Sequence, residues 1–309
     1  MATPDIFSAE DLLSTPALFA GFEPAVRLAV ISDPIAHSKS PAFQNAALRA
    51  CGIPVAYTRL HVPPSEFAKV LRALPRAGFL GANVTIPHKA SALAGVDVAD
   101  AYARASGSVN TIVVSGQKLH GFNTDGPGIS RAISEEFSRD LRDLRVVLVG
   151  AGGGAGRAIA VQCAMEKCAR LVLVNRTFEK AQLLATELAP YFLSGPTSGS
   201  DDRVVAIRLE DGDLRRELKN ADILINATSL GMDRSDAPVV AASLLHSNLL
   251  VYDAVYTRGG SRLLDDAVAA GARAANGLGM LLHQGALAFE IWFNRPAPLE
   301  VMRQALLAH

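Results

Sequence analysis

The chain has 309 residues, of which 50% are hydrophobic and 19% charged, and its 30 basic residues balance 30 acidic ones. This length exceeds the usual size of one domain, so we expect two. Because no basic cluster stands out, the sequence argues against a nucleic-acid or anionic-membrane partner. The first residues lack the basic segment of a signal peptide and no apolar stretch could span a bilayer, so we expect a soluble, cytoplasmic protein.

The three cysteines and seven histidines show no metal-ligand or redox spacing. Cys51, Cys163 and Cys168 form neither a Cys-x-x-Cys pair nor a cluster with histidine, and we expect them to be reduced thiols. We expect no bound metal.

After about 26 residues, the chain alternates between strand-like and helix-like segments, which is the pattern of an α/β fold. The strand segments at residues 146–150, 171–175 and 223–227 are apolar without alternation, as in a parallel sheet covered on both faces. The predicted strands cover residues 26–31, 55–62, 81–86, 145–150, 170–175, 202–207, 221–228 and 248–255. The predicted helices cover residues 41–52, 65–78, 155–169, 279–293 and 299–308.

Smaller signals mark the ends of some elements. Ser8 and Asp11 have the spacing of a capping box, and Ser40 before Pro41 resembles a helix N-cap. A turn at Asp125 predicts a domain boundary before a helix, and residues 194–203 predict a polar loop.

A glycine-rich turn joins a buried strand to a helix at residues 150–155. Gly150 permits the tight turn, Gly152 allows the backbone to approach a pyrophosphate, and Ala155 allows close packing of helix on strand. The free N–H groups of the helix N-terminus would attract the same anion. The sequence therefore predicts a dinucleotide site that includes Gly150, Ala151, Gly152, Gly153, Gly154 and Ala155.

The end of the next strand discriminates between NAD and NADP. An NAD site usually places a carboxylate there for the ribose 2′-hydroxyl. This chain instead has Asn175, Arg176 and Thr177, followed by Lys180, and a guanidinium suits a 2′-phosphate. The sequence therefore predicts NADP.

Three segments before residue 126 are rich in small polar side chains, at residues 33–41, 81–89 and 108–126. Loops that carry serine, asparagine, threonine, lysine and aspartate suit a polyhydroxylated acid better than an apolar ligand.

Together and in this order, these segments resemble the shikimate dehydrogenase family. The motifs that match are PIAHSKSP, GANVTIPHK, VNT, NTDG, GAGGGAGRA, NRT, INATSLGM, YDAVY and GLGMLLHQ, and the resemblance runs from about Val26 to the C-terminus. It implies a substrate domain at residues 1–125, a Rossmann domain at 126–277, and C-terminal helices at 278–309 that return to the substrate domain. The sequence departs from the family pattern at Ser32, Ala254 and Ser261.

The resemblance also implies an activity, the reversible NADPH-dependent reduction of 3-dehydroshikimate to shikimate in chorismate and aromatic amino-acid biosynthesis. Ser38 and Ser40 would bind the substrate carboxylate, and Lys89 and Asp125 would be the catalytic pair. The remaining site residues that the resemblance implies are Asn83, Thr85, Asn110, Tyr256 and Gln284 for the substrate, and Thr228, Ser229 and Gly277 for the nicotinamide end of the cofactor.

The chemistry of a ketone reduction agrees with this implication. Hydride addition leaves negative charge on the carbonyl oxygen, so a cation or proton donor must stand beside it. Burial would lower the pKa of Lys89 and the Asp125 carboxylate would raise it, so Lys89 either donates the proton or stabilises the alkoxide.

Three alternatives remain open at this point: an NAD-dependent quinate/shikimate dehydrogenase, a catalytically silent relative that binds shikimate or dinucleotide, and an amino-shikimate relative. Arg176 argues against the first, and the presence of both Lys89 and Asp125 argues against the second. A monomer or a homodimer would suit the family.

Overall fold

The computed structural model describes residues 5–192, 203–231, 233, 235–256 and 260–308. The chain divides into two compact units, which are Met1–Thr124 with Leu282–His309 (unit 1) and Asp125–Leu281 (unit 2). Apart from Arg203, the polar loop predicted at 194–203 lies outside the described residues.

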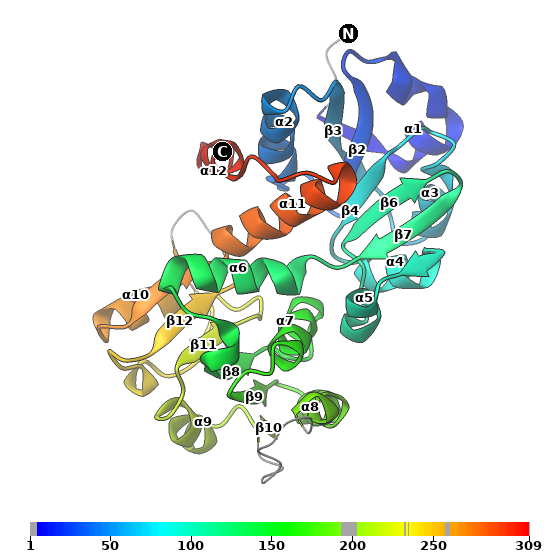
Figure 1. Cartoon of the computed structure of the whole chain (residues 1–309). Coiled ribbons are helices and arrows are strands. Elements are labelled where there is room, and N and C mark those ends of the chain that lie inside the picture. The colour runs from blue at the N-terminus through cyan, green and yellow to red at the C-terminus, as the bar shows by residue number, and fades with distance from the viewer. Residues whose placement is uncertain (1–4, 193–202, 232, 234, 257–259, 309) are drawn as a thin grey trace. The chain divides into compact units, whose positions relative to one another are not determined.

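Unit 1 contains a mixed seven-stranded sheet in the order β1-β3-β2-β4-β6-β7-β5 (Figure 1). The four strands at one end pair in parallel: β1 (Ile6–Ser8), β3 (Val55–His61), β2 (Ala25–Ser32) and β4 (Gly81–Val84). At the other end β6 (Thr111–Ser115) and β7 (Lys118–Phe122) form an antiparallel hairpin, and β5 (Val98–Ala99) pairs in parallel with β7.

Residues 5–24, which precede β2, contribute Phe7, Ala9, Leu12, Phe19 and Phe22 to the hydrophobic core of unit 1. Strand β1 extends the sheet, and α1 (Ala9–Ser14) and η1 (Pro16–Gly21) follow it. The predicted capping box is confirmed, since Asp11 N donates to Ser8 Oγ at 3.2 Å and Ser8 N to Asp11 Oδ2 at 2.7 Å. Phe7 contacts Phe19, with ring centroids 4.9 Å apart, and both belong to the hydrophobic core.

Helices α2 (Ser40–Ala50), α3 (Phe67–Ala73) and α4 (Lys89–Gly95) follow the parallel strands β2, β3 and β4, and α5 (Ala101–Ser106) and α12 (Leu299–Leu307) are further helices of unit 1. The prediction that Ser40 caps α2 is wrong, because Lys39 occupies the N-cap and Ser40 is the first helical residue. The N-cap side chain makes no capping hydrogen bond with any residue that the structure describes.

Helix α11 (Leu278–Phe293) begins in unit 2 and continues in unit 1, where it packs closely. Trp292 Nε1 donates to Ile112 O at 2.9 Å, and a Cβ at Gly81 would lie 2.4 Å from Trp292 Nε1. A Cβ at Gly285 would lie 2.4 Å from Phe43, so only glycine allows α11 to approach α2 this closely. Residues Leu282–His309 belong to unit 1, where α12 contacts α2.

Unit 2 contains a six-stranded, fully parallel sheet in the order β10-β9-β8-β11-β12-β13, which is the Rossmann order. The strands are β8 (Arg145–Val149), β9 (Arg170–Val174), β10 (Val204–Ile207), β11 (Ile223–Asn226), β12 (Leu250–Asp253) and β13 (Arg273–Asn276). Its helices are α6 (Asp125–Phe137), α7 (Gly154–Met165), α8 (Phe178–Phe192), α9 (Asp211–Leu218) and α10 (Arg262–Ala269), with short 3-10 turns η2 (Leu141–Asp143) and η3 (Ala242–Leu244).

Both faces of this sheet are buried, which explains why its strands read as continuous apolar runs. In β8, Val147 and Val149 share a core cluster with Leu214 of α9 and Leu263 of α10. The alternate residues of β8, for example Leu148, are also fully buried, and α7 contacts β8 and β9 while packing between α6 and α8. The predicted fold class is therefore confirmed.

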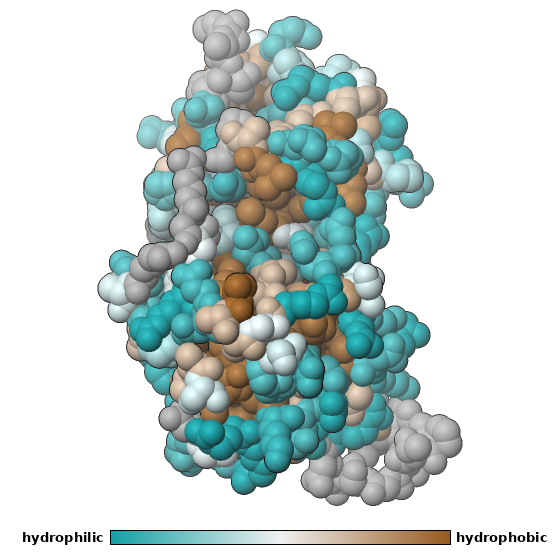
Figure 2. Space-filling view, turned by 90° about the vertical axis from the view of Figure 1, so that its left-hand side faces the viewer, coloured by the Kyte–Doolittle hydropathy of each residue, from teal (hydrophilic) through white to brown (hydrophobic). Residues whose placement is uncertain are grey.

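The last features of the fold are the hydropathy of its surface, the length and apolarity of its helices, and the grouping of side chains that can bind a metal. In Figure 2, hydrophilic residues cover much of the face shown, and hydrophobic residues appear as separate brown patches between them. None of the helices in the described part of the chain is both long enough and apolar enough to cross a membrane. Among the described residues, no group of three or more histidine, cysteine or acidic side chains could hold a metal ion.

Candidate active site

A network of buried amides stands at the end of β4 in unit 1. Asn83 Nδ2 donates to Asn110 O at 3.2 Å and to Thr111 Oγ1 at 3.1 Å. Its Oδ1 accepts from Tyr57 Oη at 2.8 Å. Every polar atom of this amide is thus used to hold its neighbours, which makes Asn83 a support for the wall of the site. Burial raises the pKa of the Tyr57 phenol well above its usual value, so Tyr57 stays a neutral donor.

Asn110 fixes the residue just before Asp125. Its Oδ1 accepts from Thr124 N at 2.9 Å, and its Nδ2 donates to Thr124 Oγ1 at 3.0 Å. Asp125 then begins α6 with a side chain that is 4% exposed. The amide of Asn110 therefore holds Thr124, the last residue of this part of unit 1.

Lys89 is the first residue of α4, and His88 holds the start of this helix. The His88 ring stacks on Phe67 with centroids 4.5 Å apart, and its Nε2 lies 2.7 Å from Val62 O. Burial lowers the pKa of His88, so the ring is held neutral. Thr85 O accepts from His88 N at 2.9 Å. The fixed His88 therefore connects the backbone of Thr85 to Lys89, the first residue of α4.

The loop between β2 and α2 presents Ser38. Ser38 O accepts from Arg59 Nη2 at 2.6 Å and from Arg59 Nε at 3.1 Å, and Ser38 N donates to Ile35 O at 3.1 Å. The backbone of this serine is therefore fixed, whereas its hydroxyl lies at the start of α2 beside Ser40 N, at 3.4 Å. Gln284 is a half-buried residue of α11 in the same unit.

In unit 2 the glycine loop lies between β8 and α7. Gly150 has a φ of +91°, which favours glycine. A Cβ at Gly156 would lie 2.1 Å from Gly150 O. The close packing that the sequence assigned to Ala155 therefore falls to Gly156, one residue later, because Gly156 is the position with no room for a side chain. Gly153 is the N-cap of α7, so the first-turn N–H groups follow directly.

Asn175 connects this loop to the end of β9. Gly152 N donates to Asn175 Oδ1 at 3.3 Å, and Asn175 Nδ2 donates to Thr177 O at 3.0 Å. A Cβ at Gly152 would lie 2.9 Å from Asn175 Nδ2 and 3.1 Å from Lys180 Cβ. The loop and the Asn175–Lys180 segment therefore form one surface, with exposed glycine backbone beside cationic side chains.

A cavity of about 210 Å³ adjoins this surface. Its lining residues are Asn175, Arg176, Phe178, Arg208, Leu209 and Glu210. A dinucleotide fits these residues, because backbone N–H groups, a helix N-terminus and guanidinium groups are the donors that phosphates require. Sequence reasoning missed Arg208, although its position directly after a predicted strand could have indicated it.

The end of β11 carries a buried hydrogen-bond network. Asn226 Oδ1 accepts from Thr228 N at 3.0 Å and from Thr228 Oγ1 at 2.7 Å, while Asn226 Nδ2 donates to Asp253 Oδ1 at 2.9 Å. Ser261 Oγ donates to Asp253 Oδ2 at 2.5 Å, and burial raises the pKa of Asp253. These bonds fix Thr228, next to the exposed Ser229.

The last two predicted residues of unit 2 follow β12 and β13. A Cβ at Gly277 would lie 2.1 Å from Ala254 O, so glycine is needed for this close approach. Tyr256 is half-buried, and burial raises the pKa of its phenol.

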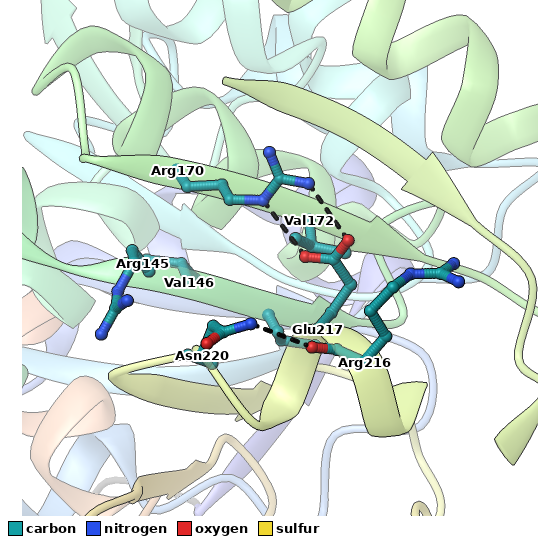
Figure 3. Close-up of a pocket in the computed structure, with 9 residues that line it drawn as sticks. Arg145, Val146, Arg170, Val172, Arg216, Glu217 and Asn220 are labelled. Carbon is teal, nitrogen blue, oxygen red and sulfur yellow. Dashed lines mark hydrogen bonds and ion pairs between the residues drawn. The ribbon is translucent and has the colours of Figure 1, made fainter. Parts of the chain in front are cut away.

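A larger cavity of about 330 Å³ lies at the opposite, amino-terminal ends of β8 and β9 (Figure 3). Its arginines are neutralised: Arg170 Nη2 lies 3.1 Å from Glu217 Oε1, and Arg145 Nη2 lies 2.9 Å from Asp222 Oδ1. Because ligands of open parallel sheets bind at the carboxyl ends of the strands, we place the active site on the other edge.

The predicted residues thus divide between the units. Unit 1 carries Ser38, Ser40, Asn83, Thr85, Lys89, Asn110 and Gln284, and unit 2 carries Asp125, Tyr256 and the residues of the dinucleotide site. Sequence reasoning also missed Tyr57, which reads as an ordinary strand residue.

A Rossmann sheet, a glycine loop at a helix N-terminus and an arginine after the second strand define an α/β dinucleotide-dependent oxidoreductase. Family models refine this class. The "Shikimate dehydrogenase substrate binding domain" matches residues 30–112, "Shikimate / quinate 5-dehydrogenase" residues 132–234, and "Shikimate 5'-dehydrogenase C-terminal domain" residues 277–307.

Similar proteins agree with these matches. The NADP(+) shikimate dehydrogenase of Methanopyrus kandleri is 42% identical over 91% of this chain and 94% of its own. The shikimate 5-dehydrogenase of Thermus thermophilus, solved with NADP(H) and shikimate, has a TM-score of 0.80 at 32% identity, over 92% of this chain and 99% of its own. The quinate dehydrogenase of Corynebacterium glutamicum, solved with NAD, has a TM-score of 0.81 at 28% identity, over 92% and 99%. The chain belongs to the shikimate dehydrogenase family.

Proposed function

We propose that this chain is an NADP-dependent shikimate dehydrogenase, which reversibly reduces 3-dehydroshikimate to shikimate and thereby serves chorismate and aromatic amino-acid biosynthesis. The observation that carries the proposal is the placement of Lys89. Its carbonyl accepts from Val109 N at 3.0 Å, which ties the start of α4 to the strand that presents Asn110. A cationic side chain and a polar wall are thus held in one rigid region of unit 1.

Lys89 supplies the positive charge that the reduction of a ketone requires beside the ketone oxygen. When bound, reduced NADP would supply a hydride to the ketone carbon, and the electrons of the C=O π bond would then leave negative charge on the ketone oxygen. The ammonium of Lys89 stabilises this charge and holds a proton for the oxygen, while Asp125 binds the hydroxyl beside it. Because His88 is buried and neutral, Lys89 stands at the helix start without a second cation from its neighbour.

The remaining polar residues orient the substrate. Ser38 and Ser40 are at the N-terminus of α2, where hydroxyl groups and the helix dipole suit a carboxylate. Thr85 and Asn110 bind ring hydroxyl groups, and Asn83 supports them from behind. Gln284 and Tyr256 complete the set of substrate ligands.

The dinucleotide is held by unit 2. The backbone of Gly150, Ala151, Gly152, Gly153, Gly154 and Ala155 binds the pyrophosphate, and Asn175, Arg176, Thr177 and Lys180 bind the 2′-phosphate. Thr228, Ser229 and Gly277 line the nicotinamide end. The buried Asn226–Asp253 network, which fixes Thr228, supports this assignment.

Steady-state kinetics of the purified protein with four substrate pairs test the proposal. Shikimate and quinate are each assayed with NADP⁺ and NAD⁺, and we expect the highest kcat/KM for shikimate with NADP⁺. A preference for quinate and NAD⁺, as the name of the Corynebacterium relative describes for that protein, would overturn the substrate and cofactor. No turnover with any pair would favour a silent binder.

Arg176→Ala tests the cofactor end separately. We expect the KM for NADP⁺ to rise while the KM for NAD⁺ stays the same, because only NADP carries the 2′-phosphate. Equal losses for both cofactors would remove Arg176 from 2′-phosphate recognition.

Three further features belong to the proposal. The substrate domain comprises residues 1–125, the Rossmann domain 126–277 and the returning helices 278–309; limited proteolysis that cuts near these limits would support them. A cytoplasmic location is supported by three free cysteines, Cys51, Cys163 and Cys168, as expected in a reducing compartment. The enzyme is a monomer or a homodimer, which sedimentation would resolve.

A further inference from the structure

Arg208 lies beside Arg176 although 32 positions separate them in the printed sequence. Strand β10 ends at Ile207, which pairs in parallel with Val174, the last residue of β9. The residues that follow each strand therefore emerge at the same edge of the sheet, and Arg176 and Arg208 line one cavity of about 210 Å³. This edge is also where the glycine loop begins.

The Arg208 guanidinium is held in place by Phe178. Its Cζ lies 4.6 Å from the centroid of the Phe178 ring, within the range of a cation–π contact. Phe178 is the first residue of α8, two positions after Arg176. The Phe178 ring thus orients the Arg208 guanidinium, and the segment that carries Phe178 also carries Arg176.

The charges in this cavity differ from those in the cavity of Figure 3. There Arg145 and Arg170 are each paired with a carboxylate. Arg176 and Arg208, in contrast, form no salt bridge with any residue that the structure describes. Two exposed guanidinium groups at one cavity suit a doubly charged anion, which accepts hydrogen bonds from both.

We propose that Arg208 is a second specificity-determining residue for the cofactor and binds the 2′-phosphate of NADP together with Arg176. This inference rests on the proposed function. Phe178 is a positioning residue, because it acts only through the Arg208 guanidinium. Glu210 lines the same cavity and opposes the two cations, since its carboxylate repels a phosphate. Arg208 and Glu210 together therefore set how strongly the site prefers a phosphorylated ribose.

Isothermal titration with two small probes tests the inference without turnover. Adenosine 2′,5′-bisphosphate carries the 2′-phosphate and adenosine 5′-monophosphate lacks it. We expect Arg208→Ala to weaken binding of the bisphosphate about tenfold, the lower end of the effect of a charge-assisted hydrogen bond. Binding of the monophosphate should change by less than about twofold. Arg216→Ala, a change to a paired surface arginine, is the matched control and should change neither.

Three variants of neighbouring residues sharpen the test. Phe178→Leu should weaken bisphosphate binding, though less than Arg208→Ala does. Phe178→Tyr should bind the bisphosphate as tightly as the wild type, because it keeps the aromatic ring. Glu210→Gln should tighten the bisphosphate and leave the monophosphate unchanged. Loss of both probes to the same extent in Arg208→Ala, or no loss of either, would overturn the inference.

The experiments distinguish a failure of the inference about Arg208 from a failure of the proposed function. If the wild type does not oxidise shikimate but Arg208→Ala still loses the bisphosphate selectively, the proposed substrate is wrong and the inference stands. If shikimate is oxidised with NADP⁺ and Arg208→Ala leaves the ratio of KM values for NADP⁺ and NAD⁺ unchanged, the proposed function stands and the inference fails.

Discussion

Replacing Tyr57 by phenylalanine removes one oxygen atom from the buried network behind the substrate wall. Tyr57 Oη donates to Asn83 Oδ1 at 2.8 Å, and both side chains are buried. The variant leaves this Oδ1 without its donor in a place that water does not reach. An unsatisfied buried acceptor costs about 1–3 kcal/mol of unfolding free energy.

The expected loss is large enough to measure by urea unfolding. With a slope of about 2–3 kcal/mol/M, a loss of about 1–3 kcal/mol lowers the urea midpoint by roughly 0.3–1.5 M. Asn83 also donates to Asn110 O and Thr111 Oγ1, so a displaced amide disturbs the wall. We therefore expect the KM for shikimate to rise several-fold while the KM for NADP⁺ stays constant.

Tyr191→Phe is the matched control, because the hydroxyl of Tyr191 makes no hydrogen bond with any described residue. Its midpoint should equal that of the wild type. In an Asn83→Ala background, Tyr57→Phe should cost much less than alone, because the acceptor has gone. Equal midpoints for Tyr57→Phe and Tyr191→Phe, or full additivity with Asn83→Ala, would refute the reasoning.

Three further predictions address the catalytic lysine, the glycine loop and pH. Lys89→Ala should lower kcat by about 10²–10⁴ and change the KM for shikimate much less, because Lys89 acts on charge that develops in the transition state; an unchanged kcat would exclude it. Gly156→Ala should weaken NADP⁺ binding and lower the urea midpoint, since its Cβ would lie 2.1 Å from Gly150 O, whereas Gly154→Ala, with nothing within 4 Å, should keep the wild-type midpoint. Equal midpoints would contradict this. Burial lowers the pKa of His88, so its contribution to stability is present above the unfolded-state pKa of about 6.5 and is lost as the pH falls below it. The urea midpoint should therefore drop more between about pH 7.5 and 5.5 in the wild type than in His88→Gln, and parallel drops would refute the assignment.

The central strands of unit 2 could be predicted because burial on both faces of the sheet requires an uninterrupted run of apolar residues. Val146 to Val149 are all buried, so every position of β8 except the first is apolar. The glycine loop was also found, since Gly150 must adopt a positive φ, although the close approach to a carbonyl was assigned to Ala155 and belongs to Gly156. Local physics determined these positions, and the sequence alone therefore revealed them.

The edge strands β1 and β13 were not predicted, whereas the edge strand β10 was. Strand β1 has three residues, and β13 (Arg273–Asn276) is half-exposed, so neither produces an apolar run. The β6–β7 hairpin turns at Gly116 and Gln117, where Gly116 has a φ of +60°. Gly116 between two strand-like runs is typical of a hairpin turn, but the polar residues of segment 108–126 indicated a binding loop instead.

Contacts between residues far apart in the sequence could not be predicted. Nothing in the sequence near Tyr57 indicates that its hydroxyl donates to Asn83, 26 residues away. Arg208 joins Arg176 only because β10 pairs with β9 in parallel register, which is a property of the sheet. Residues of the site that depend on tertiary pairing therefore require the structure.

The central claim concerns one reaction, and it is tested most directly in the biosynthetic direction. The purified protein is given 3-dehydroshikimate with NADPH, the loss of NADPH is followed, and the product is identified by mass and chromatography. We predict stoichiometric formation of shikimate, with NADH a much poorer substitute for NADPH. No oxidation of NADPH in the presence of 3-dehydroshikimate, or a product other than shikimate, would contradict the account.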